Sequence, residues 1–185
     1  MNRIAAVVGL AGSGKSELAG MFEERGWTRI RFGDVTEQEV LARGMPLSEA
    51  SERAVREEFR SEHGMAAYAV LNLPRIEAAL AKGPVVCDGM YSWEEYLLLR
   101  RVFGAGFRVV GVQASPGTRY ARLGARPHRP LSPQEAESRD HAEIENLHKA
   151  GPIAMADRTV INEGSRAELK REFDRLLAWL EEEPS

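Results

Sequence analysis

The sequence predicts an α/β protein of three layers, in which helices cover both faces of a five-stranded parallel sheet. Short apolar runs alternate along the chain with longer amphipathic segments, which is the pattern of strand–helix–strand units. A glycine-rich loop also stands between the first apolar run and the first amphipathic segment, where such loops bind anions. A chain of 185 residues with 43% hydrophobic residues is long enough for one well-packed domain.

The glycine-rich loop, residues 9–16, is a complete P-loop, because it matches G-x-x-x-x-G-K-[ST] at every fixed position. Its glycines let the backbone turn its N–H groups inward, and the N-terminus of the following helix adds partial positive charge. We expect Lys15 to reach the β- and γ-phosphates of ATP and the Ser16 hydroxyl to ligate Mg²⁺. The fold is therefore expected to be that of a P-loop NTPase. The predicted nucleotide-binding residues of the loop are Gly9, Ala11, Gly12, Ser13, Gly14, Lys15, Ser16 and Glu17.

Composition excludes some partners and compartments. The net charge is −3, whereas proteins that bind nucleic-acid backbones are basic, so we expect no nucleic acid. We expect no membrane span, since there is no run of about 18 apolar residues, and no signal peptide, since the first strand begins almost at the N-terminus. The one cysteine, Cys87, lies in an apolar run and predicts a buried thiol. We expect a cytoplasmic monomer or weak homo-oligomer.

The strands and helix starts can be placed from apolar runs and capping signals. The predicted strands are residues 3–8, 28–32, 84–87, 107–113 and 159–161. Four helices should begin at a capping box, in which Ser or Thr is followed three residues later by Glu, with Pro133 in the first turn of one of them. The four pairs are Thr36 with Glu39, Ser92 with Glu95, Ser132 with Glu135 and Ser165 with Glu168.

Two segments exceed what a minimal sheet of strands and crossovers requires. Residues 46–82 predict two helices separated near His63, with Pro74 breaking or kinking the second. Residues 127–149 contain three prolines followed by a charged helix. Small-molecule kinases place a substrate-binding region and a lid at such positions. We therefore expect a core of residues 1–45, 83–126 and 150–182, a helical substrate-binding insertion of residues 46–82, and a short lid of residues 127–149.

Two carboxylates follow predicted strands and should face the P-loop. Ligands of open parallel sheets bind outside the carboxyl ends of the strands. Asp88 is predicted to hold Mg²⁺ or one of its waters, although a turn former before Gly89 would also be acidic. Asp34 is predicted to accept a proton from an acceptor hydroxyl or to bind a sugar hydroxyl, with a helix cap as the alternative.

Arginines gather at the entrance to the predicted lid. Arg119, Arg122 and Arg126 are spaced so that they share one face of a helix, and Arg129 and Arg139 follow. Guanidinium groups stabilise the charge that spreads over a transferring phosphoryl group, although a charged helix face can also be merely solvated. Other chemistries lack their motifs: the four histidines have no zinc-site spacing, and no G-x-S-x-G elbow is present.

Five features together resemble the nucleoside-monophosphate-kinase branch of P-loop proteins. They are the P-loop, Gly33-Asp34, Asp88-Gly89, Arg122-Leu123-x-x-Arg126 and residues 159–164. Over nearly its whole length the chain is most similar to dephospho-CoA kinases and to the uncharacterised adenylate-kinase-related ATPases of archaea. The latter share the progression G-x-x-G-S-G-K-S, G-D-V, D-G, A-S-P-x-x-R and V-N-E-G.

The resemblance implies roles for particular residues. Arg122 and Arg126 would clamp phosphates at the lid entry, Arg139 would close from the other side, and Asp34 would lie near the acceptor hydroxyl. The loop that contacts the adenine ring would be Asn162, Glu163 and Gly164.

The chain also departs from these families. After Asp88-Gly89 it lacks the arginine of adenylate kinases, and it has Gly33-Asp34-Val35 where dephospho-CoA kinases usually have D-x-D. We expect an ATP-dependent small-molecule phosphotransferase that acts on a hydroxyl or phosphate acceptor, with dephospho-CoA as the first acceptor to test and a nucleoside monophosphate as the second. The alternative that the departures favour is a nucleotide-binding switch or slow ATPase without a transfer substrate.

Overall fold

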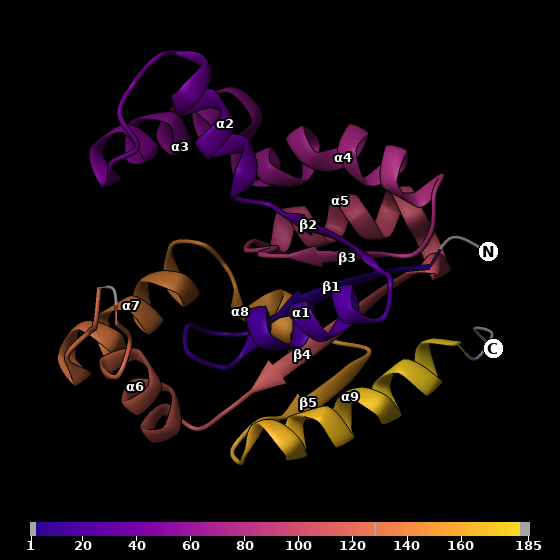
Figure 1. Cartoon of the computed structure of the whole chain (residues 1–185). Coiled ribbons are helices and arrows are strands. Elements are labelled where there is room, and N and C mark those ends of the chain that lie inside the picture. The colour runs from indigo at the N-terminus through magenta and orange to yellow at the C-terminus, as the bar shows by residue number, and fades with distance from the viewer. Residues whose placement is uncertain (1–2, 128, 182–185) are drawn as a thin grey trace.

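A five-stranded, wholly parallel sheet forms the centre of the computed structural model, which describes residues 3–127 and 129–181 (Figure 1). The strand order is β2-β3-β1-β4-β5, which confirms the predicted α/β fold. Residues 1–2 and 182 of the predicted core and residue 128 of the predicted lid lie outside the described residues. The strands are β1 (Ile4–Val8), β2 (Thr28–Arg31), β3 (Val85–Asp88), β4 (Phe107–Gln113) and β5 (Arg158–Ile161).

Helices pack on both faces of the sheet because successive strand side chains point to opposite sides. In β1, Ile4, Ala6 and Val8 face one apolar core, and Ala5 and Val7 face the other. The first core is covered by α4 (Ala67–Leu80) and α5 (Trp93–Phe103), and the second by α1 (Lys15–Glu24) and α9 (Arg166–Glu181) (Figure 1). These are the three layers that the sequence predicts.

The connection from β2 to β3 contains α2 (Asp34–Ala42), α3 (Glu49–His63) and α4, with a 3₁₀ turn at Gly64–Ala66. α4 packs against the sheet, whereas α2 and α3 project from it (Figure 1). The predicted insertion of residues 46–82 is thus divided between the core layer and the projecting part. Pro74 does not break α4, since buried side chains on both sides of it, such as Tyr68 and Ile76, hold the helix against the core.

Three of the four predicted capping boxes are present. Ser92 and Ser132 each exchange hydrogen bonds with the Glu three residues later, and Ser165 and Glu168 do the same before α9. The box at Thr36 was wrongly predicted, because α2 begins two residues earlier, at Asp34. Thr36 is buried, and its Oγ1 lies 2.6 Å from the Tyr68 hydroxyl, which satisfies the polar atom inside the fold.

After β4 come α6 (Pro116–Gly124), which lies in the predicted core, and α7 (Pro133–Glu145), which lies in the predicted lid of residues 127–149, and a short α8 (Ala150–Ala154) leads back to β5. A 3₁₀ turn, Gly104–Gly106, precedes β4. Cys87 is buried in β3, as predicted, and burial raises the pKa of its thiol above the ordinary range. Within residues 3–127 and 129–181, no helix is both long and apolar enough to cross a membrane.

Candidate functional site

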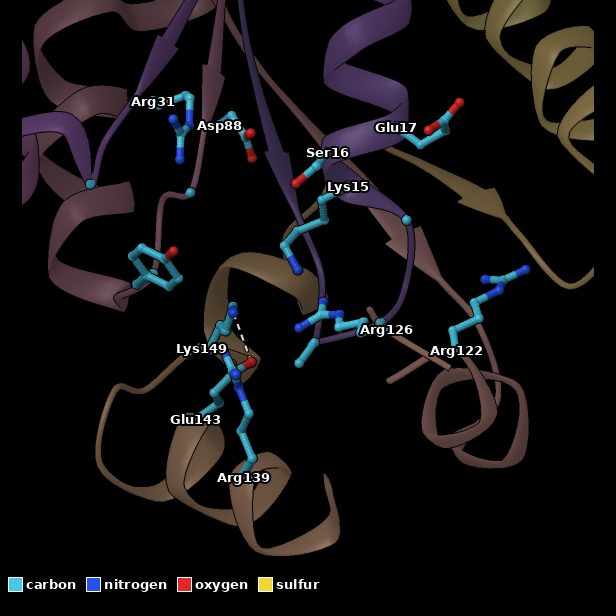
Figure 2. A pocket seen from close by; sticks show the side chains of 16 residues that line it. Lys15, Ser16, Glu17, Arg31, Asp88, Arg122, Arg126, Arg139, Glu143 and Lys149 are labelled. Atoms are coloured by element: carbon cyan, nitrogen blue, oxygen red, sulfur yellow. Dashed lines mark hydrogen bonds and ion pairs between the residues drawn. The ribbon is translucent and has the colours of Figure 1, made fainter. Parts of the chain in front are cut away.

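The P-loop forms one wall of a cavity of about 390 Å³ at the carboxyl ends of the strands; we call it the nucleotide cavity (Figure 2). Six residues of the loop and of the first turn of α1 line it, so the structure brings most of the predicted binding loop to one place. They are Ala11, Gly12, Gly14, Lys15, Ser16 and Glu17. The two other predicted loop residues, Gly9 and Ser13, line a smaller neighbouring cavity beside β4.

Gly14 shows why the loop requires glycine. Its φ is 100°, a left-handed conformation that side-chain-bearing residues rarely adopt. A Cβ there would lie 2.2 Å from Nδ2 of Asn162, whose amide donates to the carbonyl of Ser13 at 2.8 Å. The predicted base-contacting residue Asn162, which directly follows β5, therefore supports the P-loop.

We expect Gly14→Ala to weaken Mg-ATP binding at least tenfold, because the added methyl must displace Asn162 and open the loop, in a backbone conformation that is already strained. Equilibrium titration with a fluorescent ATP analogue measures the effect. Gly20→Ala is the matched control, since Gly20 lies within α1 with nothing near its Cβ position, and alanine favours helix. Equal nucleotide affinity in Gly14→Ala and wild type would contradict the expected role of the loop.

Lys15 folds back onto its own loop, where its Nζ donates to the carbonyl of Leu10 at 2.9 Å. Burial and the nearby charge of Lys149 together lower the pKa of Lys15 to about 7. In Figure 2 the ends of Lys15 and Lys149 point toward the same part of the cavity. Two basic side chains, the half-buried Lys15 and the buried Lys149, that point into the same part of a cavity create a favourable place for an anion.

Lys149 and Glu143 are site residues that the sequence analysis missed. Lys149 has only 1% of its surface exposed, and its Nζ donates to a Glu143 carboxylate oxygen at 2.7 Å while lying 4.8 Å from the centre of the Tyr91 ring. Arg139 donates to the other Glu143 oxygen at 3.1 Å. All four side chains line the nucleotide cavity. The one available signal was that Lys149 is one of only four lysines in an arginine-rich chain.

Asp88 and Ser16, the predicted metal ligands, both line the cavity and point into it (Figure 2). Asp88 ends β3, and one of its carboxylate oxygens accepts from Arg29 of β2 at 3.1 Å. No cluster of three or more acidic, histidine or cysteine ligands is found among the described residues. Mg²⁺ commonly takes one or two protein oxygens and completes its shell with phosphates and waters, so this donor set fits Mg²⁺ held with a nucleotide.

The predicted arginines separate into two groups. Arg122, Arg126 and Arg139 line the nucleotide cavity, and Nη1 of Arg122 is buried without a hydrogen-bond partner among the described residues. Arg119 instead is 4% exposed and forms a two-pronged ion pair with Asp140 of α7, at 2.7 and 2.6 Å. Its Nη1 also donates to the carbonyl of Ala11, so Arg119 connects both α7 and the P-loop to α6.

A second cavity of about 490 Å³ lies beside the first and is lined by α2, α3 and the lid; we call it the acceptor cavity. It is lined by Gly33, Thr36, Glu37, Glu49, Glu52, Arg56, Arg60, Tyr68, Tyr91, Arg129, Arg139, Glu143 and Leu147. Gly33, Tyr91, Arg139 and Glu143 also line the nucleotide cavity. A molecule in one cavity can therefore meet a molecule in the other at these shared residues.

The structure does not bring Asp34 into the lining of either cavity. One oxygen of its carboxylate accepts from Arg75 of α4 at 3.0 Å, and the other lies 3.5 Å from Arg31. The sequence could not reveal this arrangement, since Arg75 lies 41 residues further along the chain.

Two residues of the loop predicted to contact adenine, Glu163 and Gly164, make contacts elsewhere in the structure. Glu163 accepts hydrogen bonds from the backbone N–H of Ser115 and the hydroxyl of Thr118, at the start of α6. Gly164 lines a separate surface groove beside Glu168. Neither residue lines the nucleotide cavity.

The fold and this site define a P-loop protein of the kinase-like class. The family model described as "AAA domain" matches residues 6–146, and the chain belongs to that family. It also belongs to the UPF0200 proteins. The relative from Thermococcus gammatolerans is 34% identical over 94% of this chain and 93% of its own, and that from Thermococcus kodakarensis is 36% identical over 94% and 96%.

Two of the solved structures that share this fold are kinases by name. A gluconokinase from Sinorhizobium meliloti aligns with a TM-score of 0.56 at 20% identity, covering 98% of each chain. A shikimate kinase from Bacteroides thetaiotaomicron aligns with a TM-score of 0.63 at 15% identity, covering 97% of this chain and 99% of its own. At these identities the likeness establishes the fold.

Proposed function

We propose that the protein is a kinase that transfers the γ-phosphate of Mg-ATP to a small-molecule acceptor. The observation on which this rests is the pair of adjoining cavities, one lined by the P-loop and the other by α2, α3 and the lid, that share four lining residues. A nucleotide switch needs only the first cavity. A transferase needs a second ligand site that reaches the γ-phosphate.

Charge supports a triphosphate in the nucleotide cavity. Its lining holds six basic side chains against three carboxylates. The basic residues come from different parts of the chain: Lys15 from the P-loop, Arg31 from β2, Arg122 and Arg126 from the predicted lid entry, and Arg139 and Lys149 from the predicted lid. Cations placed around a transferring phosphoryl group stabilise the charge that spreads over its oxygens. ATP in this orientation would present its γ-phosphate toward the shared residues.

Glu143 is the carboxylate that we assign to the acceptor side, in place of Asp34. Glu143 lines both cavities, whereas Asp34 is held by Arg75 and Arg31. Burial alone would raise the pKa of Glu143, but Lys149 and Arg139 outweigh burial and lower it, so the group stays ionised at neutral pH. An ionised carboxylate there can accept a hydrogen bond from an acceptor hydroxyl and hold its oxygen in line.

In the transfer step the acceptor oxygen forms a bond to the γ-phosphorus while the bond from that phosphorus to the β–γ bridging oxygen breaks. The electron pair of the broken bond leaves with ADP, and the hydroxyl proton passes to Glu143 and then to solvent. Ser16 and Asp88 would hold Mg²⁺ with the nucleotide, where it neutralises phosphate charge. Closure of the segment that carries Arg139 and Lys149 over the bound nucleotide would exclude water and thereby favour transfer over hydrolysis.

Dephospho-CoA and nucleoside monophosphates are the first acceptors to test. ADP release from Mg-ATP is measured with and without dephospho-CoA, AMP, CMP, UMP, GMP and small hydroxyl metabolites. Stimulation of about a hundredfold by one compound, equivalent to roughly 2.7 kcal/mol, together with a phosphorylated product, is the expected result. Slow ADP release that no acceptor changes would favour a nucleotide switch instead.

Nucleotide binding should take up a proton at alkaline pH. The pKa of Lys15 is about 7 in the empty site, and bound phosphates raise it because they favour the charged ammonium. Below pH 6 Lys15 is already protonated and affinity is flat. Above pH 7 binding must protonate it, so affinity falls by up to about tenfold per pH unit. Calorimetry at pH 8 in two buffers of different ionisation enthalpy should show uptake approaching one proton, and no uptake at pH 8 would contradict this.

A further inference from the structure

The acceptor cavity contains four arginines, of which three are neutralised by carboxylates of the same cavity. Arg56 pairs with Glu49 at 2.5 Å and Glu52 at 3.3 Å. The other two pairs are Arg129 with Glu49 at 3.7 Å and Arg139 with Glu143 at 3.1 Å. Arg60 is the fourth, and within residues 3–127 and 129–181 it has no carboxylate at ion-pair distance. The cavity thus offers one unneutralised guanidinium.

Arg60 is held on the last turn of α3 and is half-buried against the body of the protein. Burial raises the pKa of the nearby Glu95 carboxylate to about 7, and hydrogen bonds and the charge of Arg60 offset this only in part. Glu95 Oε2 accepts from the backbone N–H of Tyr91 at 2.6 Å. Glu95 is 2% exposed and does not line the cavity, so it leaves the cavity side of Arg60 open to a ligand. A guanidinium in that position binds carboxylate or phosphate oxygens in pairs.

Arg60 lies away from the place where transfer would occur. It lines only the acceptor cavity, whereas the reacting acceptor atom must lie at the residues that both cavities share. Those shared side chains are Tyr91, Arg139 and Glu143, and Arg139 is already paired with Glu143. At this junction an acceptor phosphate would be repelled by the ionised Glu143 carboxylate, and neither Tyr91 nor the already paired Arg139 would supply a free positive charge. A neutral hydroxyl would find a hydrogen-bond acceptor.

We propose that the acceptor is a hydroxyl-bearing anion, whose carboxylate or phosphate is bound by Arg60 while its hydroxyl lies at Glu143. The inference rests on the proposed kinase function. The hydroxyls of Thr36 and Tyr68, 2.6 Å apart, line the same cavity and can bind further polar groups of the acceptor. The arrangement disfavours nucleoside monophosphates that accept through their phosphate.

The anion site can be tested without knowing the acceptor. The protein is saturated with Mg²⁺ and a non-hydrolysable ATP analogue, so that the P-loop is filled, and is then titrated with inorganic phosphate or with acetate. The Nε–Hε resonance of Arg60, assigned by its loss in Arg60→Lys, should shift saturably with each anion. That of Arg53, an exposed arginine of the same helix, is the reference. An Arg60 resonance that moves no more than that of Arg53 would overturn the proposal.

Acceptor pairs that differ by one charge then test the specificity. Glycerate is compared with glycerol, gluconate with glucose, and glycerol 3-phosphate with glycerol, alongside dephospho-CoA and AMP. For whichever compound is phosphorylated, we expect Arg60→Met to raise KM about a hundredfold with a smaller change in kcat, Arg60→Lys to recover part of the loss, and Arg53→Met to match wild type. Efficient transfer to a neutral alcohol, or to the phosphate of AMP, unaffected by Arg60→Met would overturn the anion site while leaving the kinase function standing. An Arg60 shift with no phosphorylated product from any acceptor would leave the site standing and remove the kinase.

Discussion

Replacing Lys15 with alanine should lower the rate of phosphoryl transfer by at least about a thousandfold, roughly 4 kcal/mol of transition-state stabilisation. Lys15 is the cation of the P-loop itself, and its ammonium faces the part of the nucleotide cavity where Lys149 also points. Removing it leaves the glycine backbone and the N-terminus of α1 to bind phosphates without a mobile positive charge. ADP release under saturating acceptor measures the loss.

Two comparisons distinguish a loss of catalysis from a loss of folding. Lys82→Ala removes an exposed lysine just beyond α4 and should leave activity unchanged. The fold depresses the pKa of Lys15, so its charge opposes folding, and Lys15→Ala should melt close to the wild-type temperature. Undiminished transfer in Lys15→Ala would exclude the mechanism, whereas loss of activity accompanied by unfolding would have to be repeated with Lys15→Met.

Breaking the buried Arg119–Asp140 pair should destabilise the protein by about 3–5 kcal/mol, because removal of one partner leaves the other buried without its counter-charge. The two groups are 4% and 5% exposed, and Arg119 additionally donates to the carbonyls of Ala11 and Ala114. For a chain of this length the loss corresponds to a fall in Tm of roughly 10 °C. Thermal unfolding of Arg119→Met and of Asp140→Leu measures it.

The double variant tests whether the unpaired buried charge causes the loss of stability in the two single variants. Arg119→Met with Asp140→Leu leaves no unpaired charge, so most of the loss should be recovered. The exposed pair of Arg53 and Glu57 on α3 provides the reference, since breaking a solvated i,i+4 pair costs less than about 1 kcal/mol. Single variants at Arg119 and Asp140 that cost no more than this reference would show that the lid is not anchored through the pair.

Features formed by residues close together in the chain could be predicted from the sequence, because neighbouring residues alone determine them. The P-loop needs a fixed order of glycines, lysine and serine, and the capping boxes need two residues three apart. The structure places Gly14 and Lys15 at the start of α1, as the motif requires, and confirms the capping box at Ser92. Thr36 carries the same capping signal but is buried against Tyr68, from another helix. Tertiary packing decided that position, and the spacing of residues alone does not report it.

The site residues that the sequence missed are those whose meaning depends on distant partners. Lys149 becomes a cavity cation because Glu143 and Tyr91 hold it there, and Asp34 is drawn away by Arg75, from a helix that begins 33 residues later. In the sequence, a lysine in a charged helical segment or an aspartate after a strand looks the same whether or not its side chain lines the cavity. Sequence patterns therefore identified the P-loop itself better than the side chains that surround it.

The burial of Cys87 makes the natural chain suitable for labelling. The sequence contains one cysteine, sealed between β-strands with a thiol that scarcely ionises, so maleimide reagents should leave the folded protein unmodified. Two dyes can then be attached without first removing a native thiol. Ser61→Cys in α3 and Ser138→Cys in α7 are exposed positions on the two sides of the acceptor cavity. Energy transfer between them would report, one molecule at a time, how the two walls move as nucleotide and acceptor arrive.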